Sequence, residues 1–342
     1  MKIHLVSTHQ YPARRGAVAA ARVSDWLAKG LVELGHDVSY ELPYASADPL
    51  PAGVQLTQER RFDVDVMWFN GLPAGRFPQT HGVPWLRALH SPEKRFAPFI
   101  RDNWVFVSAS HAALFGQQRY VHNGIDPAEL LYREAKDGYF LFIVADLLQL
   151  EAKGFKIVRE LMRRFGIHVV VAGAISDPTP YERTFAEEGM GYVGHVSGHT
   201  KAELLAGARA LLFPTQADET FGLVVAETLM SGTPVICSDR GACQELVPPE
   251  FGFVCSNFDE YAAALRQTHT ISPLACRIFA LEHYHYLRMA RDYLVEFERE
   301  VVRWGSPAYR ATLGQCSRWV SFELRGRRFA VGIPDRKHFQ AV

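Results

Sequence analysis

The stretch Phe-Pro-Thr-Gln-Ala-Asp-Glu-Thr-Phe-Gly-Leu-Val-Val-Ala-Glu occupies residues 213–227 and predicts the end of a strand, a loop and the start of a helix. Apolar residues precede the loop, and an apolar run follows Gly222. A glycine at the head of a helix leaves backbone N–H groups open at the positive helix end, where a phosphate can dock. Glu219 and Glu227 flank that position, and their carboxylates can accept hydrogen bonds from sugar or ribose hydroxyls.

The same strand–loop–helix pattern recurs along most of the chain. Short β-rich runs alternate with stretches of helical periodicity, which predicts parallel sheets with helices on both faces. The predicted strands form two series, 3–6, 38–42, 64–69, 85–89 and 104–107, then 139–144, 168–172, 191–193, 210–213 and 234–237. The turn-rich segment His122-Asn123-Gly124-Ile125-Asp126-Pro127 divides the two series and is suited to a hinge. We therefore expect an α/β protein with two doubly wound domains that face one cleft.

We divide the chain into four parts on this basis. They are an N-terminal domain (1–122), a C-terminal domain (123–285), a terminal helix (286–305) and a tail (306–342). The periodicity predicts one long helix over 278–304, whose end can cross back to the N-terminal domain. From residue 307 on, seven basic and two acidic residues give the tail a net charge of +5, and alternation over 318–324 and 327–333 predicts a hairpin. We interpret the tail as a solvated appendage rather than a flap that binds an acceptor or a partner.

Composition excludes several classes of protein. The chain has 342 residues, 48% of them hydrophobic and 22% charged, with 37 basic and 37 acidic side chains. This balance argues against a disordered chain, a nucleic-acid coat and a polybasic membrane protein. Five cysteines without a Cys-x-x-Cys spacing make a disulfide scaffold or a zinc ribbon improbable. No apolar run is long enough to span a bilayer and the first residues lack a signal peptide, so we expect a soluble, cytoplasmic protein.

Five motifs in this order resemble those of retaining glycosyltransferases of the GT-B fold, the large group called family 4. The hallmark is the pair Glu219 and Glu227, separated by seven residues, followed by the Gly-Thr-Pro-Val turn at 232–235. The segment 122–126, the pair Lys153-Gly154 and the triplet Glu245-Leu246-Val247 are similar to further motifs of the family. The resemblance covers residues 1 to about 300. It implies two Rossmann-like domains and transfer of a sugar, with retention, from a nucleoside diphosphate-sugar to an acceptor hydroxyl.

The resemblance also implies roles for single residues. The catalytic group would consist of Glu219 at the sugar hydroxyls, Lys153 at the diphosphate and His90 at the donor sugar. Glu227 would hold the ribose of the donor. Backbone N–H groups of the segment Phe221, Gly222 and Leu223 would approach sugar and phosphate.

Two positions depart from the family pattern. Asp146 follows a predicted strand where the family has an arginine, so an acid stands at the expected diphosphate site. In the N-terminal domain, Gly16 and Ala17 replace a Gly-Gly pair in the loop that closes on the phosphates. Lys156, Arg240 or Arg15 could supply the cation that Asp146 does not.

The resemblance implies a nucleotide sugar as donor substrate, no cofactor and no metal. The acceptor can be a small molecule, a glycan or a lipid-linked sugar, and a homo-oligomer stays open. We reject Asp63-Val64-Asp65 as a metal site, because Asp65 is expected to face solvent from a strand. We also reject His283 and His285, whose imidazoles would lie about 200° apart on a helix.

Three other functions are alternatives to glycosyl transfer. A nucleotide-sugar 2-epimerase shares the two-domain architecture but needs no acceptor. A non-catalytic nucleotide- or glycan-binding protein is motivated by Asp146. A dinucleotide oxidoreductase is improbable, because no Gly-x-Gly-x-x-Gly follows a predicted strand.

Overall fold

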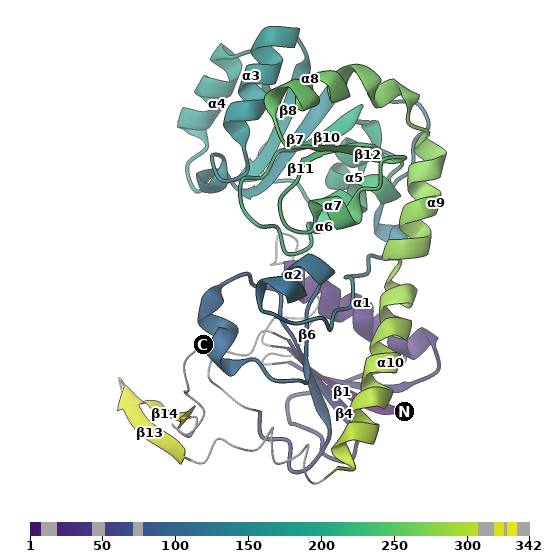
Figure 1. The fold of residues 1–342 in the computed structure, drawn as a ribbon, viewed down its shortest axis with the longest axis vertical. Helices are drawn as coiled ribbons and strands as arrows, with labels where there is room; N and C mark the ends of the chain where they lie inside the picture. The colour runs from purple at the N-terminus through teal and green to yellow at the C-terminus, as the bar shows by residue number, and fades with distance from the viewer. Residues whose placement is uncertain (8–18, 43–51, 71–77, 307–317, 325–326, 334–342) are drawn as a thin grey trace.

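The computed structural model of the protein describes residues 1–7, 19–42, 52–70, 78–306, 318–324 and 327–333. Two six-stranded sheets, one above the other in Figure 1, form the bulk of the described chain. Every strand pair within these two sheets is parallel. The predicted α/β fold with two doubly wound domains is confirmed.

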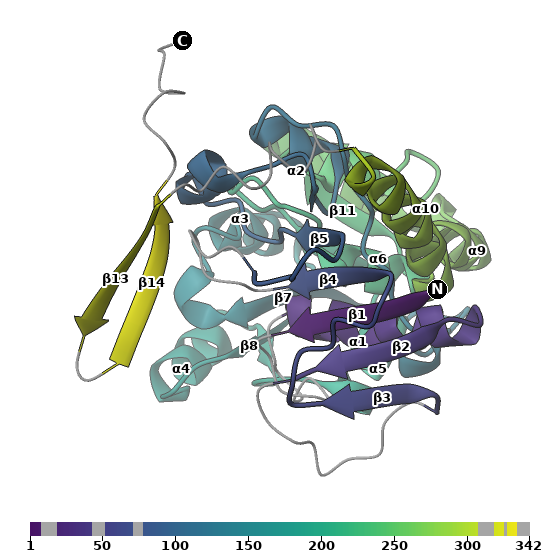
Figure 2. The same cartoon turned by 90° about the horizontal axis from the view of Figure 1, so that it is seen from below.

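The N-terminal sheet has the strand order β3-β2-β1-β4-β5-β6. Its strands are β1 (Lys2–Ser7), β2 (Asp37–Glu41), β3 (Val54–Thr57), β4 (Val66–Asn70), β5 (Trp85–Ala88) and β6 (Trp104–Val105). Helix α1 (Ala19–Glu33) packs against β1, β2 and β3, and the shorter helices of this half are η1 (Lys94–Phe99) and α2 (Ala109–Leu114) (Figure 2). All five residues of β4 are buried, as expected for a central strand covered on both faces.

The C-terminal sheet repeats this topology with the order β12-β11-β10-β7-β8-β9. Its strands are β7 (Tyr139–Asp146), β8 (His168–Ala174), β9 (Gly191–Tyr192), β10 (Ala210–Phe213), β11 (Val235–Ser238) and β12 (Gly252–Cys255). Its helices are α3 (Phe155–Phe165), α4 (Thr179–Glu187), α5 (Gly198–Gly207), α6 (Leu223–Met230), α7 (Cys243–Leu246) and α8 (Phe258–Gln267), with the 3-10 turns η2 (Pro127–Glu129), η3 (Leu147–Gln149) and η4 (Thr268–Thr270). In both sheets the order reverses beside the first strand, between β1 and β4 and between β7 and β10. Open parallel sheets bind ligands at such a switch point.

The sequence did not predict the strands β3 and β12. Each has four residues and forms an outer edge of its sheet. Only one residue of β3 and two of β12 are buried. Partly exposed edge strands lack the continuous apolar run that marks central strands, so hydrophobic pattern alone does not detect them.

The prediction of one helix over 278–304 is wrong, because the structure has two helices there. Helix α9 spans Pro273–Tyr284 and α10 spans Tyr286–Trp304, with His285 in an extended conformation between them (φ −69°, ψ 139°). Residues 122–131, which we call the linker, connect the two halves, and Ile125 of the linker lies in the break. Its N–H donates to the carbonyl of Tyr284 (2.8 Å), and its carbonyl accepts from Tyr286 N–H (3.0 Å). His285 Nδ1 then caps α10 by accepting from Leu287 N–H (3.0 Å).

Helix α10 packs against the N-terminal half of the protein, although its sequence follows the C-terminal sheet (Figures 1 and 2). It contacts α1 and β5. Gly30 of α1 meets Ala290 so closely that a Cβ at residue 30 would lie 2.8 Å from the Ala290 Cβ. The chain therefore crosses between the two halves twice, once at the linker and once between α9 and α10.

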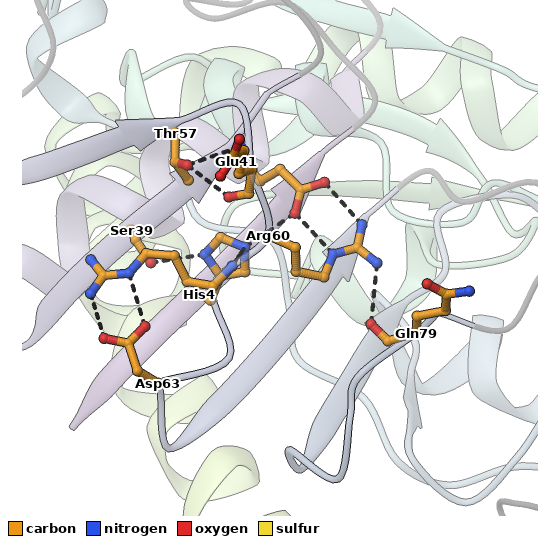
Figure 3. Close-up of polar contacts among 9 residues, drawn as sticks. His4, Ser39, Glu41, Thr57, Arg60, Asp63 and Gln79 are labelled. Atoms are coloured by element: carbon orange, nitrogen blue, oxygen red, sulfur yellow. Dashed lines mark hydrogen bonds and ion pairs between the residues drawn. The ribbon is translucent and has the colours of Figure 1, made fainter.

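A polar network ties strands β1 and β2 of the N-terminal sheet to the segment after β3 (Figure 3). The fully buried His4 contacts its register partner Ser39 (Nδ1 to Oγ, 2.8 Å) and Glu41 (Nε2 to Oε2, 3.2 Å). Arg60 donates to both oxygens of Glu41, at 2.9 Å each, and to the carbonyl of Gln79 at 3.3 Å. Burial would raise the pKa of Glu41, but hydrogen bonds from His4 and Arg60 hold it below its ordinary value.

Near the end of the chain, β13 (Arg318–Leu324) and β14 (Arg327–Ile333) pair in antiparallel fashion. In both views this pair lies to one side of the two sheets (Figures 1 and 2). Within the described part of the chain, no helix has both the length and the apolar character needed to cross a bilayer.

Candidate functional site

A cavity of about 850 Å³ lies at the carboxyl ends of β7 and β10, the switch point of the C-terminal sheet. The C-terminal domain contributes the ends of β7, β8 and β10 and the first turns of α5 and α6. The N-terminal domain contributes one face of α1, with Arg22, Trp26 and Lys29. The linker closes the remaining side with residues 126 and 128–131. The cavity is thus built from both domains.

Glu227 lies one turn inside α6 and is 1% exposed. Arg22 Nη1 donates to its Oε1 (2.8 Å), and Lys201 Nζ donates to its Oε2 (2.5 Å). Burial alone would raise the pKa of Glu227, but the charges of Lys201 and Arg22 hold it below the ordinary value. Glu227 is therefore a buried, ionised carboxylate held by one cation from each domain.

Arg22 connects this carboxylate to the linker. Its Nη2 donates to Glu129 Oε2 (2.5 Å), and its guanidinium lies 4.4 Å from the centre of the Trp26 ring. Trp26 Nε1 in turn donates to Glu129 Oε1 (2.6 Å). Burial would lower the pKa of Arg22, but Glu227 and Glu129 raise it above its ordinary value. The guanidinium thus bridges Glu227 and Glu129 across the domain boundary.

Glu219 lies in the loop after β10 and pairs with Lys153, whose Nζ donates to Oε2 at 2.7 Å. The side chains are 16% and 24% exposed, so the pair faces the cavity without being fully solvated. Lys153 precedes α3 in a turn that is anchored to the same loop, because Gln216 N–H donates to the carbonyl of Ala152 (2.9 Å). The two charges are therefore positioned by one connected piece of backbone.

Gly222 heads α6 between the two glutamates, as the sequence predicts. Its φ of 81° and ψ of 67° are accessible to glycine and strained for other residues. Among the described residues no side chain caps this helix end, and Gly222, Leu223 and Val224 line the cavity. The first N–H groups of the helix are thus available to an acceptor in the cavity.

Phe221 is positioned differently from its neighbours. Its side chain is 2% exposed and packs against His122 and Tyr284, with ring centres 5.7 and 6.0 Å apart. Among the described residues that line the cavity, Phe221 is not included. Its side chain therefore packs the loop against His122 and Tyr284 instead of facing the cavity.

His90 follows β5 in the N-terminal domain and lies beside the Glu219 loop. Its carbonyl accepts a hydrogen bond from Thr220 Oγ1 (3.2 Å). Ser108 of the same domain donates through Oγ to the carbonyl of Thr220 (2.6 Å). His90 is not among the described residues of the cavity wall, and its backbone carbonyl makes this contact with the loop.

Asp146 ends β7 and has a local structural role. Its Oδ1 accepts from Leu148 N–H (2.9 Å) and caps the turn η3. The described wall of the cavity includes Ala145 and Gln149 but not Asp146. Gly16 and Ala17, and the alternative cation Arg15, lie outside the described residues.

Three cationic residues of the cavity, Arg22, Lys29 and Lys201, carry no signal in the sequence. They lie on helices α1 and α5, where a charged side chain is indistinguishable in sequence from a solvated one. In the structure each pairs with a carboxylate of the same cavity, Lys29 with Asp126 (2.5 Å) and the other two with Glu227. Every lysine and arginine of the described wall thus has an acidic partner. An anionic ligand must compete with these carboxylates for the cations.

The residues of the two rejected metal sites interact with other groups in the structure. Asp63 pairs with Arg61 (2.7 Å), and Asp65 accepts from Lys2 N–H (2.7 Å). His283 Nδ1 contacts the carbonyl of Phe279 (2.9 Å). Within the described ranges, no three or more His, Cys, Asp or Glu residues are arranged to hold a metal ion.

The C-terminal half of the chain is similar to a known family. Residues 143–270 match the family model of glycosyl transferases group 1. Over 118 residues the chain is 37% identical to a probable transglycosylase of Burkholderia thailandensis. That match covers 34% of this chain and 29% of the relative, so less than a third of the relative's length is represented.

Solved structures resemble the chain over nearly its whole length. AviGT4, a glycosyltransferase involved in avilamycin A biosynthesis, has a TM-score of 0.69 at 22% identity and covers 90% of this chain and 99% of its own. HepE of Anabaena, solved in complex with UDP, has a TM-score of 0.64 at 14% identity and covers 87% and 100%. HepE has also been solved with UDP-glucose, and that complex has a TM-score of 0.64. At these identities the likeness shows the fold, which is the two-domain GT-B architecture.

Proposed function

We propose that the protein is a retaining glycosyltransferase of the family-4 type, which moves a sugar from a nucleoside diphosphate-sugar to an acceptor hydroxyl. One observation carries the proposal: Glu219 and Glu227 line the same cavity on either side of the start of α6, which no described side chain caps. The cavity lies at the switch point of a glycosyl transferases group 1 domain. AviGT4 and the nucleotide complexes of HepE share the surrounding fold.

In this proposal Glu227 binds the ribose of the donor. A carboxylate has about four lone-pair sites, and Arg22 and Lys201 occupy two of them. Because Glu227 is 1% exposed, the ribose hydroxyls reach it only after one of the two cations moves. Arg22 can move without leaving the site, since Glu129 and Trp26 also hold it.

Lys153 and the first N–H groups of α6 act on the diphosphate. The bond between the anomeric carbon and the diphosphate oxygen breaks, and its electron pair leaves with the diphosphate. Positive charge placed where this negative charge develops stabilises the transition state. Lys153 then divides its hydrogen bonds between the phosphate and Glu219, which frees the carboxylate to bind sugar hydroxyls. We propose that these protein groups, rather than a metal ion, neutralise the leaving group.

Retention follows if the acceptor oxygen bonds the anomeric carbon on the face that the diphosphate leaves. The acceptor proton then passes to a phosphate oxygen, and no protein nucleophile is needed. The spacing of Glu219 and Glu227 supports this assignment through the family resemblance. His90, placed by its backbone beside the Glu219 loop, would face the donor sugar from the N-terminal domain.

Asp146 does not oppose this proposal. Its carboxylate accepts a backbone hydrogen bond in η3 and is outside the described cavity wall. The charge that a family arginine would supply then falls to Lys153, which lines the cavity beside Glu219.

A nucleotide panel tests the proposal. UDP, GDP, ADP and TDP, and their glucose conjugates, are added to the protein while its unfolding midpoint is measured. A ligand that binds the folded state raises the midpoint by mass action. We expect one nucleotide series to stabilise the wild type and Glu282→Gln, an exposed control on α9, but not Glu227→Gln. Equal stabilisation of the wild type and Glu227→Gln, or none of the wild type, contradicts the proposal.

Product stereochemistry tests the reaction itself. The donor that stabilises the protein is incubated with sugar and lipid-linked acceptors, and the new bond is examined by NMR. We expect the anomeric configuration of the donor in the product. An inverted product contradicts the retaining assignment, and a free epimerised nucleotide sugar without acceptor indicates a 2-epimerase.

A further inference from the structure

A second carboxylate of the C-terminal domain reaches into the N-terminal domain, away from the cavity. Glu245 in α7 accepts hydrogen bonds from the N–H groups of Ala109 (2.9 Å) and Ser110 (3.2 Å), the first residues of α2. Nε2 of His122, in the linker, contacts Oε1 of the same carboxylate. The Glu245 and His122 side chains are 20% and 14% exposed, so the contact is largely shielded from water.

The start of α2 also holds the Glu219 loop. Ser108, which caps α2 by accepting from His111 N–H (3.0 Å), donates to the carbonyl of Thr220 (2.6 Å). Thr220 Oγ1 donates to the carbonyl of His90 (3.2 Å). The residue next to Glu219 is therefore bonded to two loops of the N-terminal domain.

A third contact, within the C-terminal domain, links the turn before α7 to Glu219. Ala242 N–H donates to the carbonyl of Glu219 (2.9 Å), one residue before α7 begins. Gly241 lies against the same backbone with φ 56°, and a Cβ there would be 2.3 Å from the Glu219 carbonyl oxygen. Only glycine fits this approach, so the turn before α7 and the Glu219 loop are held together.

These contacts close a ring that we call the Glu245 clamp, made of Glu245, Ser108, Thr220 and the turn 241–242. The ring runs from Glu245 through the start of α2 to Thr220 and back through Glu219 to α7. Glu227 is outside it, because Glu227 lies inside α6 and Lys201 of its own domain also holds it. Docking of the N-terminal domain at α2 is thus linked through the ring to the position of Glu219, whereas Glu227 has no direct contact with the ring.

We propose that Glu245 is a positioning residue, which places Glu219 for sugar transfer when the N-terminal domain docks at α2. The inference rests on the proposed function, since it assigns Glu219 to the reacting sugar. Loss of the Glu245 carboxylate leaves two N–H groups of α2 without their acceptor and loosens the docking. The Glu219 loop then loses its fixed position, while nucleotide binding at Glu227 continues.

Kinetics of Glu245→Ala test this separation. We expect kcat for release of nucleoside diphosphate from the nucleotide sugar to fall at least roughly tenfold, because small displacements of a reacting group cost about that much or more. The dissociation constant for UDP, GDP, ADP or TDP, whichever stabilises the wild type, should change by less than about twofold, since Glu227 keeps its contacts. Glu245→Gln keeps an acceptor oxygen for the α2 amides and should recover most of kcat. Glu282→Gln serves as the control.

Ser108→Ala gives a second test, because it removes the hydroxyl that donates to the Thr220 carbonyl within this ring. We expect its effect on kcat and that of Glu245→Ala to be non-additive in the double variant, as for two parts of one ring. A kcat within about twofold of wild type in Glu245→Ala overturns the proposal, as does full additivity. Equal loss of kcat and nucleotide affinity also overturns it, because a general structural role would produce that result. Failure of the wild type to bind any nucleotide would instead refute the proposed function.

Discussion

Glu227 combines two properties that rarely occur together, near-complete burial and a negative charge. A buried carboxylate stays ionised only when cations or hydrogen bonds compensate for lost hydration. Arg22 and Lys201 provide that compensation from different domains. The carboxylate is therefore held ready for hydroxyl donors before any ligand arrives.

The pH dependence of stability should reveal this charge. Glu227→Gln leaves two partly buried cations without their partner and should cost about 1–3 kcal/mol at pH 7. The pKa of Glu227 in the folded protein lies below its ordinary value of 4.5. Its contribution is therefore complete above the unfolded pKa and disappears as the pH falls through the lower folded pKa. We expect the gap in calorimetric unfolding midpoints between wild type and Glu227→Gln to be constant above about pH 5.5 and to narrow below about pH 4.5. A difference in midpoints that persists unchanged to pH 3 would show that the charge of Glu227 does not cause the stability difference between the two proteins.

Arg22 should compete with the nucleotide for Glu227. Replacing it by methionine keeps the apolar contact with Trp26 and removes the hydrogen bond to Glu227, while Lys201 still neutralises the carboxylate. We expect Arg22→Met to bind nucleoside diphosphate up to about tenfold more tightly, in line with the loss of one charge-assisted hydrogen bond from the unbound state. Isothermal titration calorimetry measures this directly. Weaker binding would mean that the guanidinium contacts the ligand instead of competing with it.

The sequence located some residues of the cavity and could not locate others. Glu219, Lys153 and Glu227 belong to motifs with fixed spacing, and all three line the cavity, although their roles stay predictions. Arg22 is 205 residues from Glu227, and nothing in the periodicity of α1 distinguishes it from a solvated arginine. Asp146 was expected at the diphosphate because of its position after β7, whereas a turn cap depends on backbone geometry that a single sequence does not contain.

At the scale of helices and strands, hydrophobic pattern identified the central strands and failed where an element depends on its neighbours. The edge strands β3 and β12 exist because an adjacent strand offers hydrogen bonds, and their own residues are half exposed. The break at His285 depends on Ile125, which is distant in sequence and replaces the helical hydrogen bonds there. Local pattern carries no information about such partners.

The contact between α1 and α10 can be tested by substitution. In an isolated helix Gly30→Ala would be stabilising by about 1 kcal/mol. Here the new Cβ would lie 2.8 Å from the Ala290 Cβ and 3.1 Å from the Tyr286 carbonyl, neither of which can rotate away. We expect Gly30→Ala to lower the free energy of unfolding by about 1–3 kcal/mol, measured by urea denaturation. Ala290→Gly in the same chain should restore part of this loss, and a more stable Gly30→Ala protein would contradict the close packing.

At the scale of the whole molecule, the domains are connected in two different ways. The linker and the α9–α10 break join them by backbone hydrogen bonds and apolar packing. Polar contacts also join the domains elsewhere, between Arg22 and Glu227, Ser108 and Thr220, and Ala109 and Glu245. Polar contacts of this kind can separate and re-form, which is typical of interfaces between domains that move. The first connection is suited to a hinge and the second to closure around a ligand.

A crystal structure with bound nucleoside diphosphate would test the central claim most directly. We expect the ribose hydroxyls within hydrogen-bond distance of Glu227 and the diphosphate at the N–H groups of Gly222 and Leu223. Arg22 or Lys201 should have withdrawn from Glu227, and Lys153 should contact a phosphate oxygen. A nucleotide bound elsewhere, with Glu227 still held by both cations, would contradict the account.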